Sequence, residues 1–461
     1  RRRHLVTGNR KVTGIEDDVL DIDALDDAQR SNLQGEGALL AALTSHRTGR
    51  MGDIVATIQA EQDAIIRRPL SGVLVVQGGP GTGKTAVALH RAAFLLYRHR
   101  ERIAKSGVLL VGPSTVFLKY IEKVLPSLGE TGAVLLTPGQ LYPGLDTNAT
   151  DAPAVAGIKG RSVMAEVLKN HIANYQRVPE RDEELRVGSH TIVLRRKDVR
   201  SARDRARRSG DAHNAARNGF VTGLLKILAE DLAREMGLDA AGERLPELLE
   251  ELRSSIDVRR ALNLAWFPIG PGGALRALLG KPHKLRAAAG DLLSPTEHAT
   301  LLEHRREEFT VEDVPLLDEL AELLGTSPQP TQARDDSARE YAGAVVDMTE
   351  TGGMVSAEML AARWEEEGPA TTLAERAVED REWTYGHLVV DEAQELSPMQ
   401  WRALFRRVPS KSATVVGDLA QSSQVDNART WSSILSEFVG DRFALQVLTG
   451  SYRTPQSVMD L

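Results

Sequence analysis

One stretch of the chain has the residue types and spacing of a loop that binds phosphate. Eight consecutive residues satisfy the pattern G-x-x-x-x-G-K-[ST] at every fixed position: Gly78, Gly79, Pro80, Gly81, Thr82, Gly83, Lys84 and Thr85. Consecutive glycines let the backbone turn several N–H groups toward one anion, and a helix N-terminus adds partial positive charge. In such loops the lysine reaches the outer phosphates and the final hydroxyl ligates Mg²⁺. We therefore predict a nucleoside triphosphate site here.

A pair of carboxylates supplies the second part of that chemistry. Asp391 and Glu392 directly follow the apolar run 388–390, so we expect them at the carboxyl edge of a sheet, where open α/β sheets bind ligands. One carboxylate can hold Mg²⁺ beside a phosphate loop, and the next can orient or deprotonate the attacking water. Acids end many strands, so it is their position downstream of the phosphate loop that favours hydrolysis.

A third candidate is the turn 417–422, which follows another apolar run. Gln421 in this turn could contact a terminal phosphate and report whether it is present. A Gly-Asp turn that contains glutamine is also ordinary turn chemistry, and the turn alone does not decide between the two.

Short apolar runs typical of buried parallel strands must position these residues. We predict strands at 72–77, 107–112, 133–137, 387–392, 413–418 and 443–448. Helix formers without Gly or Pro follow the phosphate loop over 86–96, and an amphipathic helix is predicted over 53–68. Strands that alternate with helices indicate an α/β fold with a parallel sheet.

The middle of the chain has a different character. Residues 146–384 are rich in Ala, Leu, Glu and Arg with helical periodicity, so we predict a large, mainly helical insertion domain. It would interrupt one nucleotide-binding lobe formed by 51–145 and 385–461. A small β-containing segment is predicted over 1–50, where the acids of 17–23 favour a solvated turn because the spacing of a calcium loop is missing.

Within the insertion we predict a hairpin over 185–194, helices over 220–238 and 245–264, a loop over 268–273 and a linker at 326–332. The stretch Arg195–Arg208 is strongly basic. It is either a helix that contacts nucleic acid or a solvated face. The interspersed Asp198 and Asp204 favour the solvated face.

Composition limits the classes of protein that remain. A chain of 461 residues is long enough for two or more domains. The net charge is -7, so a grip on nucleic acid would need a local basic face. The chain has no cysteine, which excludes disulfides and thiolate metal sites and fits a reducing, cytoplasmic location. No apolar run is long enough to span a membrane.

Taken in chain order, these motifs resemble those of the UvrD/Rep-like superfamily-1 helicases. The resemblance is carried by the phosphate loop, by Asp391-Glu392-Ala393-Gln394, by 415–418 with Gln421, and by 448–453. It covers residues 53–145 and 385–461, the predicted nucleotide-binding lobe. It implies a RecA-like P-loop NTPase lobe that binds and hydrolyses ATP with Mg²⁺.

The resemblance also implies roles on the phosphate side of the site. Gln62 would contact adenine ahead of the loop. Lys84 and Thr85 would bind phosphate and Mg²⁺, Asp391 would hold Mg²⁺, and Glu392 would be the catalytic base.

Three further roles follow from the same resemblance. Gln421 would sense the γ-phosphate, Tyr452 would stack on adenine, and Arg453 would neutralise charge on the transferred phosphoryl group. Without the motif order, Tyr452 and Arg453 would be interpreted as a packed aromatic and a surface arginine.

Within the superfamily the chain is most similar to the HelD family of helicase-like ATPases, which bind bacterial RNA polymerase. The similarity rests on 14–18, 54–66, stretches within 111–130, and 311–319. It implies that the protein binds the core polymerase as a monomer and that the insertion enters the main channel and opens the clamp. ATP would then be used to release stalled or idle enzyme and to clear nucleic acid from it.

Two departures from the superfamily pattern bear on this hypothesis. Residues 422–427 contain no aromatic residue, whereas unwinding members stack bases there, at about 1–3 kcal/mol per base. Trp431, further on, is predicted to be a core residue. The chain starts at Arg1 without methionine and ends at Leu461, so we expect a fragment without the second RecA-like lobe and the family's N-terminal coiled coil, and hence weak hydrolysis.

Two alternatives stay open. One is a UvrD/Rep-type DNA helicase that translocates on single-stranded DNA in repair. The other is a binding module whose nucleotide site regulates docking with little turnover. The missing aromatic residues and the HelD-like insertion favour polymerase remodelling over strand tracking, whereas only kinetics would distinguish remodelling from regulated docking.

Overall fold

The computed structural model describes residues 2–8, 11–18, 61–103, 105–114, 118, 132–239, 241–304, 306, 308–325, 373–422 and 430–448. The predicted linker at 326–332 and most of the predicted helix over 53–68 lie outside these residues, although 61–66 are helical. At the N-terminus, β1 (Arg2–Gly8) and β2 (Lys11–Asp18) form an antiparallel hairpin.

A six-stranded, all-parallel sheet forms the centre of the α/β fold, as the sequence predicts. Its spatial order is β10-β3-β9-β8-β4-β5. The strands are β3 (Val73–Gly78), β4 (Val108–Val111), β5 (Ala133–Leu136), β8 (His387–Val390), β9 (Ala413–Gly417) and β10 (Phe443–Leu448). All six predicted strands are confirmed, and β3 and β8, which carry the two candidate motifs, lie on either side of β9.

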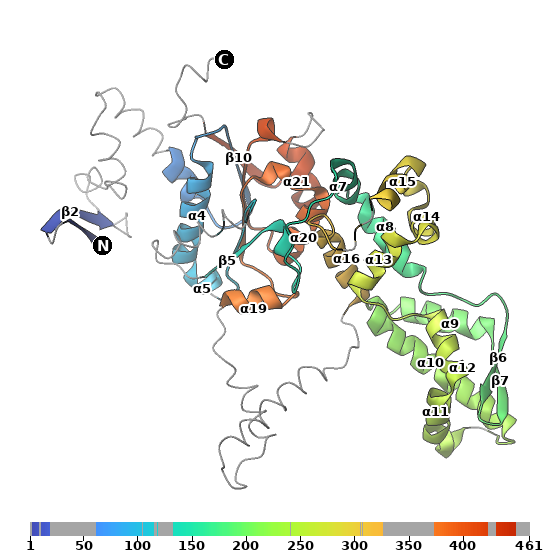
Figure 1. Cartoon of the computed structure of the whole chain (residues 1–461). Coiled ribbons are helices and arrows are strands. Elements are labelled where there is room, and N and C mark those ends of the chain that lie inside the picture. The colour runs from blue at the N-terminus through green and yellow to red at the C-terminus, as the bar shows by residue number, and fades with distance from the viewer. Residues whose placement is uncertain are drawn as a thin grey trace, which may run out of the picture.

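Helices cover both faces of this sheet (Figure 1). On one face are α4 (Lys84–Arg98) and α5 (Arg100–Ile103), and on the other are α19 (Leu373–Glu379), α20 (Pro398–Arg407) and α21 (Trp431–Val439). Alternate residues of each strand enter the two cores; Val75 packs toward α20 and α21, while Val76 packs toward α4. Burial on both faces explains why the strands are continuous apolar runs.

The described part of the chain between β5 and β8 is mainly helical and contributes most of two further hydrophobic cores. The core nearer the sheet is built by α7 (Pro153–Lys159), α8 (Val163–Ala173), α13 (Pro271–Gly280), α14 (Pro282–Ala289), α15 (Pro295–Glu303) and α16 (Val314–Leu324). It includes Met399 of α20. Arg402 and Arg406 of α20 pair with Glu319 of α16, and Arg406 also pairs with Asp318.

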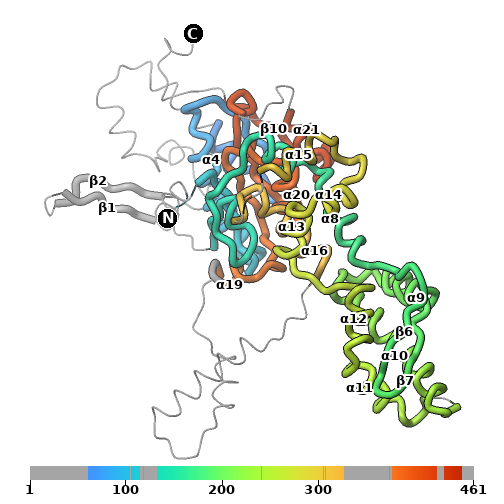
Figure 2. Tube along the Cα trace, turned by 45° about the vertical axis from the view of Figure 1, so that its right-hand side comes forward, coloured from blue at the N-terminus to red at the C-terminus, as the bar shows by residue number. Residues whose placement is uncertain are grey.

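The second core lies in a distal half that extends away from the sheet (Figures 1 and 2). It is built by β6 (Glu183–Val187), β7 (His190–Leu194), α9 (Arg196–Arg207), α10 (His213–Glu235), α11 (Leu245–Ser254) and α12 (Ile256–Ala265). The predicted hairpin is confirmed as β6 and β7. No helix among the described residues is both long and apolar enough to cross a bilayer.

Two predictions within the insertion are wrong in detail. The single helix predicted over 245–264 is two helices that meet at Ser255. The Ser255 hydroxyl caps the second helix by accepting a hydrogen bond from Val258 N, and it donates to Arg186 O at 2.7 Å. The loop predicted over 268–273 ends at Gly270. Pro271 begins α13, since proline lacks only an N–H that a helix start leaves unpaired.

Arg91 of α4 fixes the segment that precedes the sheet. Its guanidinium is buried and donates to Thr414 Oγ1 and to the carbonyl oxygens of Ile65, Ile66, Arg68 and Pro69 at 2.7–3.1 Å. Burial, together with the charge of Arg68, lowers the pKa of Arg91 to about 10, so it stays cationic at neutral pH. A cation at the end of helical residues 61–66 satisfies carbonyls that have no helical partner.

We expect Arg91→Met to lower the free energy of unfolding by about 3 kcal/mol or more, because several buried carbonyls lose their donor. The measurement is denaturant unfolding, with amide hydrogen exchange of residues 65–69 as a local readout. Arg98→Met, at an exposed position of the same helix, is the matched control. An Arg91→Met protein with the wild-type midpoint and exchange rates would contradict this account.

Candidate functional site

The phosphate-loop sequence connects the end of β3 to the start of α4. Gly78 is the last residue of β3, and Lys84 is the first of α4. Gly81 and Gly83 have φ angles of 73° and 83°, a region that side chains disfavour. These glycines let the loop turn back over the N-terminus of α4.

The Lys84 ammonium is folded into this loop. Its Nζ donates to the carbonyl oxygens of Gly78 at 2.7 Å and Gly79 at 3.1 Å. Thr82 Oγ1 also donates to Gly79 O at 2.9 Å. A Cβ on Gly78 would lie 2.7 Å from Thr82 Oγ1, so this close arrangement requires glycine. A buried cation thus lies where the sequence predicts that phosphate binds.

Thr85 and Asp391 meet at the carboxyl edge of the sheet. Thr85 Oγ1 donates to Asp391 Oδ2 at 2.7 Å, and Asp391 Oδ1 accepts from the Glu392 N–H at 3.0 Å. Burial raises the pKa of the Asp391 carboxyl above its ordinary value, and the hydrogen bond from Thr85 opposes that shift. The structure therefore brings together the two residues predicted to hold Mg²⁺, from positions 306 residues apart.

Glu392 has a left-handed backbone, with a φ of 50°. This conformation is uncommon for a residue other than glycine and is often found at functional sites. Gln394 holds the side chain by donating from Nε2 to Glu392 Oε2 at 2.7 Å. The same glutamine accepts the Asp418 N–H at 3.0 Å through Oε1. Gln394 therefore couples the predicted base to the turn after β9.

The Asp418 carboxylate in that turn accepts hydrogen bonds from two side chains. Gln421 Nε2 donates to Asp418 Oδ2, and Gln77 Nε2 donates to Asp418 Oδ1, both at 2.8 Å. Gln77 Oε1 in turn accepts from Trp431 Nε1 at 2.8 Å. Trp431 is buried, as predicted for a core residue. Gln421 is exposed and lies at this edge of the sheet, next to the predicted site.

Gln62, from the segment that precedes the sheet, contacts the phosphate loop. It lies in helical residues 61–66, and its Nε2 donates to Thr82 O at 3.2 Å. Tyr452 and Arg453, the last two predicted site residues, lie outside the described residues.

Sequence reasoning missed the roles of Gln77 and Gln394. Gln77 ends the predicted strand 72–77, and Gln394 belongs to the motif Asp391-Glu392-Ala393-Gln394. A polar residue that ends a buried strand was the available signal, because its side chain must find a partner there. Their shared partner, Asp418 in the turn after β9, could not be predicted without knowing that β9 lies between β3 and β8.

The donor set fits a hard divalent cation. A hydroxyl and a carboxylate at a phosphate loop are oxygen ligands of the kind that Mg²⁺ uses with substrate phosphates and water. No group of three or more His, Cys, Asp or Glu side chains that could hold a metal alone occurs in the part of the chain that the structure describes. The site therefore suits an ion that arrives with a phosphate ligand.

Comparison with known proteins gives no further guide, because no protein-family model matches the sequence and no curated protein matches it.

We expect Asp391→Asn to raise the free energy of unfolding at neutral pH by about 1 kcal/mol, when Mg²⁺ and nucleotide are absent. The reason is that the pKa of the Asp391 carboxyl in the folded protein lies above its ordinary 3.8. The contribution of this carboxyl to the free energy of unfolding is therefore favourable at low pH, where it is protonated, and is lost as rising pH ionises it. The measurement is denaturant unfolding between acidic and neutral pH, where the difference should vanish toward low pH.

Asp441→Asn, which changes the same charge at an exposed position, is the control. An Asp391→Asn protein that is less stable than the wild type at neutral pH would overturn this expectation.

Proposed function

We propose that this protein binds and hydrolyses ATP with Mg²⁺. The observation that carries the proposal is the hydrogen bond between Thr85 of the phosphate-loop pattern and Asp391 at the end of β8. It brings a nucleotide loop and a pair of carboxylates to one edge of a parallel sheet, which is the arrangement that phosphoryl transfer to water requires.

Each described residue has a distinct task in this proposal. The loop N–H groups and Lys84 bind the phosphates, which a cation and oriented amides stabilise. Glu392 accepts the proton of the attacking water, and Gln394 holds its carboxylate in position. Gln421 contacts the terminal phosphate from the turn after β9.

Three residues complete the nucleotide contacts. Gln62 contacts the adenine, as the resemblance implies, and so does Tyr452 by stacking. Arg453 neutralises the transferred phosphoryl group. Thr85 and Asp391 would hold Mg²⁺, which when bound neutralises charge on the β- and γ-phosphates.

We expect Glu392→Gln to leave ATP affinity unchanged and to lower the rate of hydrolysis by about 10²–10⁴-fold, because general-base catalysis contributes that much. Binding of a fluorescent ATP analogue and phosphate release, both with Mg²⁺, are the two measurements. Lys84→Ala should lose binding as well.

Glu395→Gln, three residues further on, removes the same charge and should behave like the wild type. A wild-type protein that binds no Mg-ATP would end the proposal. Unchanged turnover in Glu392→Gln would remove Glu392 from its role.

We further propose that the chain is a UvrD/Rep-like superfamily-1 protein of the HelD type, which binds bacterial RNA polymerase in the cytoplasm, as a monomer within the complex, and clears nucleic acid from it. The order of the motifs supports this, as does a large helical insertion between β5 and β8. The absence of aromatic residues from 422–427 favours it over a DNA-tracking repair helicase.

We expect the core subunits of RNA polymerase to co-purify with the intact protein from bacterial extract after nuclease treatment. A direct protein contact survives loss of nucleic acid, whereas a DNA-tracking helicase is recovered only through DNA. Mass spectrometry of samples with and without nuclease distinguishes the two. Loss of the polymerase on nuclease treatment would favour the repair helicase.

A further inference from the structure

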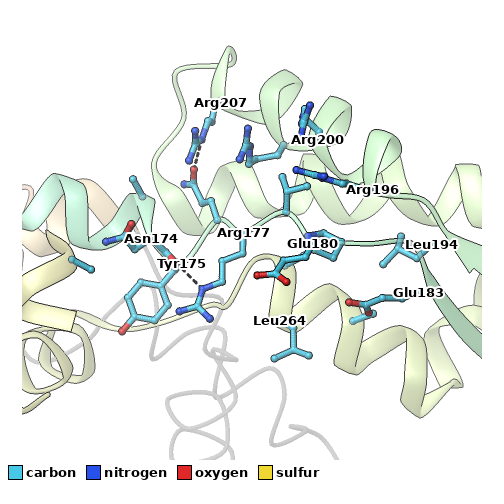
Figure 3. A pocket seen from close by; sticks show the side chains of 18 of the residues that line it. Asn174, Tyr175, Arg177, Glu180, Glu183, Leu194, Arg196, Arg200, Arg207 and Leu264 are labelled. Atoms are coloured by element: carbon cyan, nitrogen blue, oxygen red, sulfur yellow. Dashed lines mark hydrogen bonds between the residues drawn. The ribbon is translucent and has the colours of Figure 1, made fainter. Parts of the chain in front are cut away.

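A large groove lies in the insertion, at a distance from the phosphate loop. It has a volume of about 980 Å³ and lies between α9, α12, α14 and the connecting segment 173–180 (Figure 3). None of the described residues assigned to nucleotide binding lines it. The groove therefore needs a separate explanation.

One wall of the groove is a stripe of arginines on α9. Arg196, Arg200, Arg203 and Arg207 all line it. Their spacing of four, three and four residues puts them on one face of the helix, over about 16 Å. The apolar residues of α9, such as Val199, face the distal core instead. The four arginines therefore share the face of α9 that lines the groove, while the apolar residues of the helix pack into the core.

Other segments add to this positive charge. Arg177 and Lys284, from the connecting segment and α14, also line the groove. Figure 3 shows Arg177 beneath the arginines of α9, with Glu180 close by. Among the described residues, the acidic side chains in the lining are Glu180 and Glu183. The groove therefore carries a clear excess of positive charge although the chain is acidic overall.

Several of these cations have no anionic partner. Within the described residues, the guanidinium groups of Arg196 and Arg200 form no ion pair with a carboxylate, and both side chains are exposed. The backbone N–H of Arg196 donates to Asp182 Oδ1 at 2.7 Å. Arg207 donates to the neutral Gln176 Oε1 at 2.6 Å. Burial and the neighbouring Arg203 lower the pKa of Arg207, so like charges crowd here. An anion in the groove would relieve that repulsion.

The facing wall is apolar. It is formed by α12 through Ala261, Leu264 and Ala265. Leu264 is 59% exposed, so its side chain is accessible to a ligand in the groove. A ligand for this groove thus needs anionic groups on one side and apolar groups on the other.

We propose that this groove binds single-stranded nucleic acid, with phosphates along the α9 arginines and bases against Leu264. Guanidinium groups bind phosphate oxygens in a bidentate manner and also stack on bases. Glu180 and Glu183 favour a nucleic acid over an acidic peptide, because base amino groups can donate to carboxylates. The site does not depend on ATP hydrolysis.

The test is fluorescence anisotropy with labelled single strands of about 12 nucleotides, as RNA and as DNA, without ATP. We expect the double variant Arg196→Ala and Arg200→Ala to bind about tenfold more weakly or worse. The slope of log affinity against log salt should fall by about 1.4, since each phosphate contact on a single strand contributes about 0.7. Leu264→Asp should weaken binding further.

The matched control removes Arg244 and Arg253, two exposed arginines outside the groove. It has the same change in net charge and should bind like the wild type. Circular dichroism and the unfolding midpoint establish that all variants fold.

Three outcomes would overturn the proposal. One is a wild-type protein that does not bind single strands at low salt. Another is equal binding by the groove variant and the wild type. The last is a groove that binds an acidic peptide but no oligonucleotide. Because no ATP is added, failure here leaves the ATPase proposal untouched. Comparison of RNA with DNA shows which sugar is preferred.

Discussion

The hydrogen bond from Thr85 to Asp391 depends on the whole parallel sheet. The two residues follow different strands, and only the pairing of β3 and β8 with β9 brings the strand ends to one edge. That pairing in turn depends on burial of both faces of the sheet, by α4 on one side and by α20 and α21 on the other. Asp391 is held in a buried place where its charge is costly, which is typical of functional carboxylates.

A polar layer behind this edge holds the site together. The side chain of Gln394 contacts two partners and that of Gln77 contacts three, and both reach the Asp418 turn. A Cβ on Gly417 would lie 2.4 Å from Gln394 Oε1, so this network also requires glycine at the end of β9. Buried polar networks stabilise one arrangement only when all their members are satisfied. The position of Glu392 is therefore set by Gln394 of the same motif and by the Asp418 turn that Gln394 contacts.

The insertion contacts α20, the helix that follows the carboxylate pair in the chain. Met399 N, at the start of α20, donates to Gly160 O at 3.0 Å, and Arg406 of the same helix pairs with Asp318 and Glu319. The half of the insertion that makes these contacts shares a core with α20, while the distal half has its own. The basic groove lies between elements of the two halves, since α14 belongs to the nearer half and α9 to the distal one.

The sequence by itself determined the α/β class, all six strands of the sheet, the loop at 78–85 and the hairpin at 185–194, because these depend on local pattern: apolar runs, glycine spacing and turn residues. It did not determine the break at Ser255, whose hydroxyl is bound by Arg186 from another element. The partners of Gln77 and the groove across from the α9 arginines also required the tertiary structure. Those features join segments distant in the chain, and a one-dimensional pattern carries no information about which of them meet.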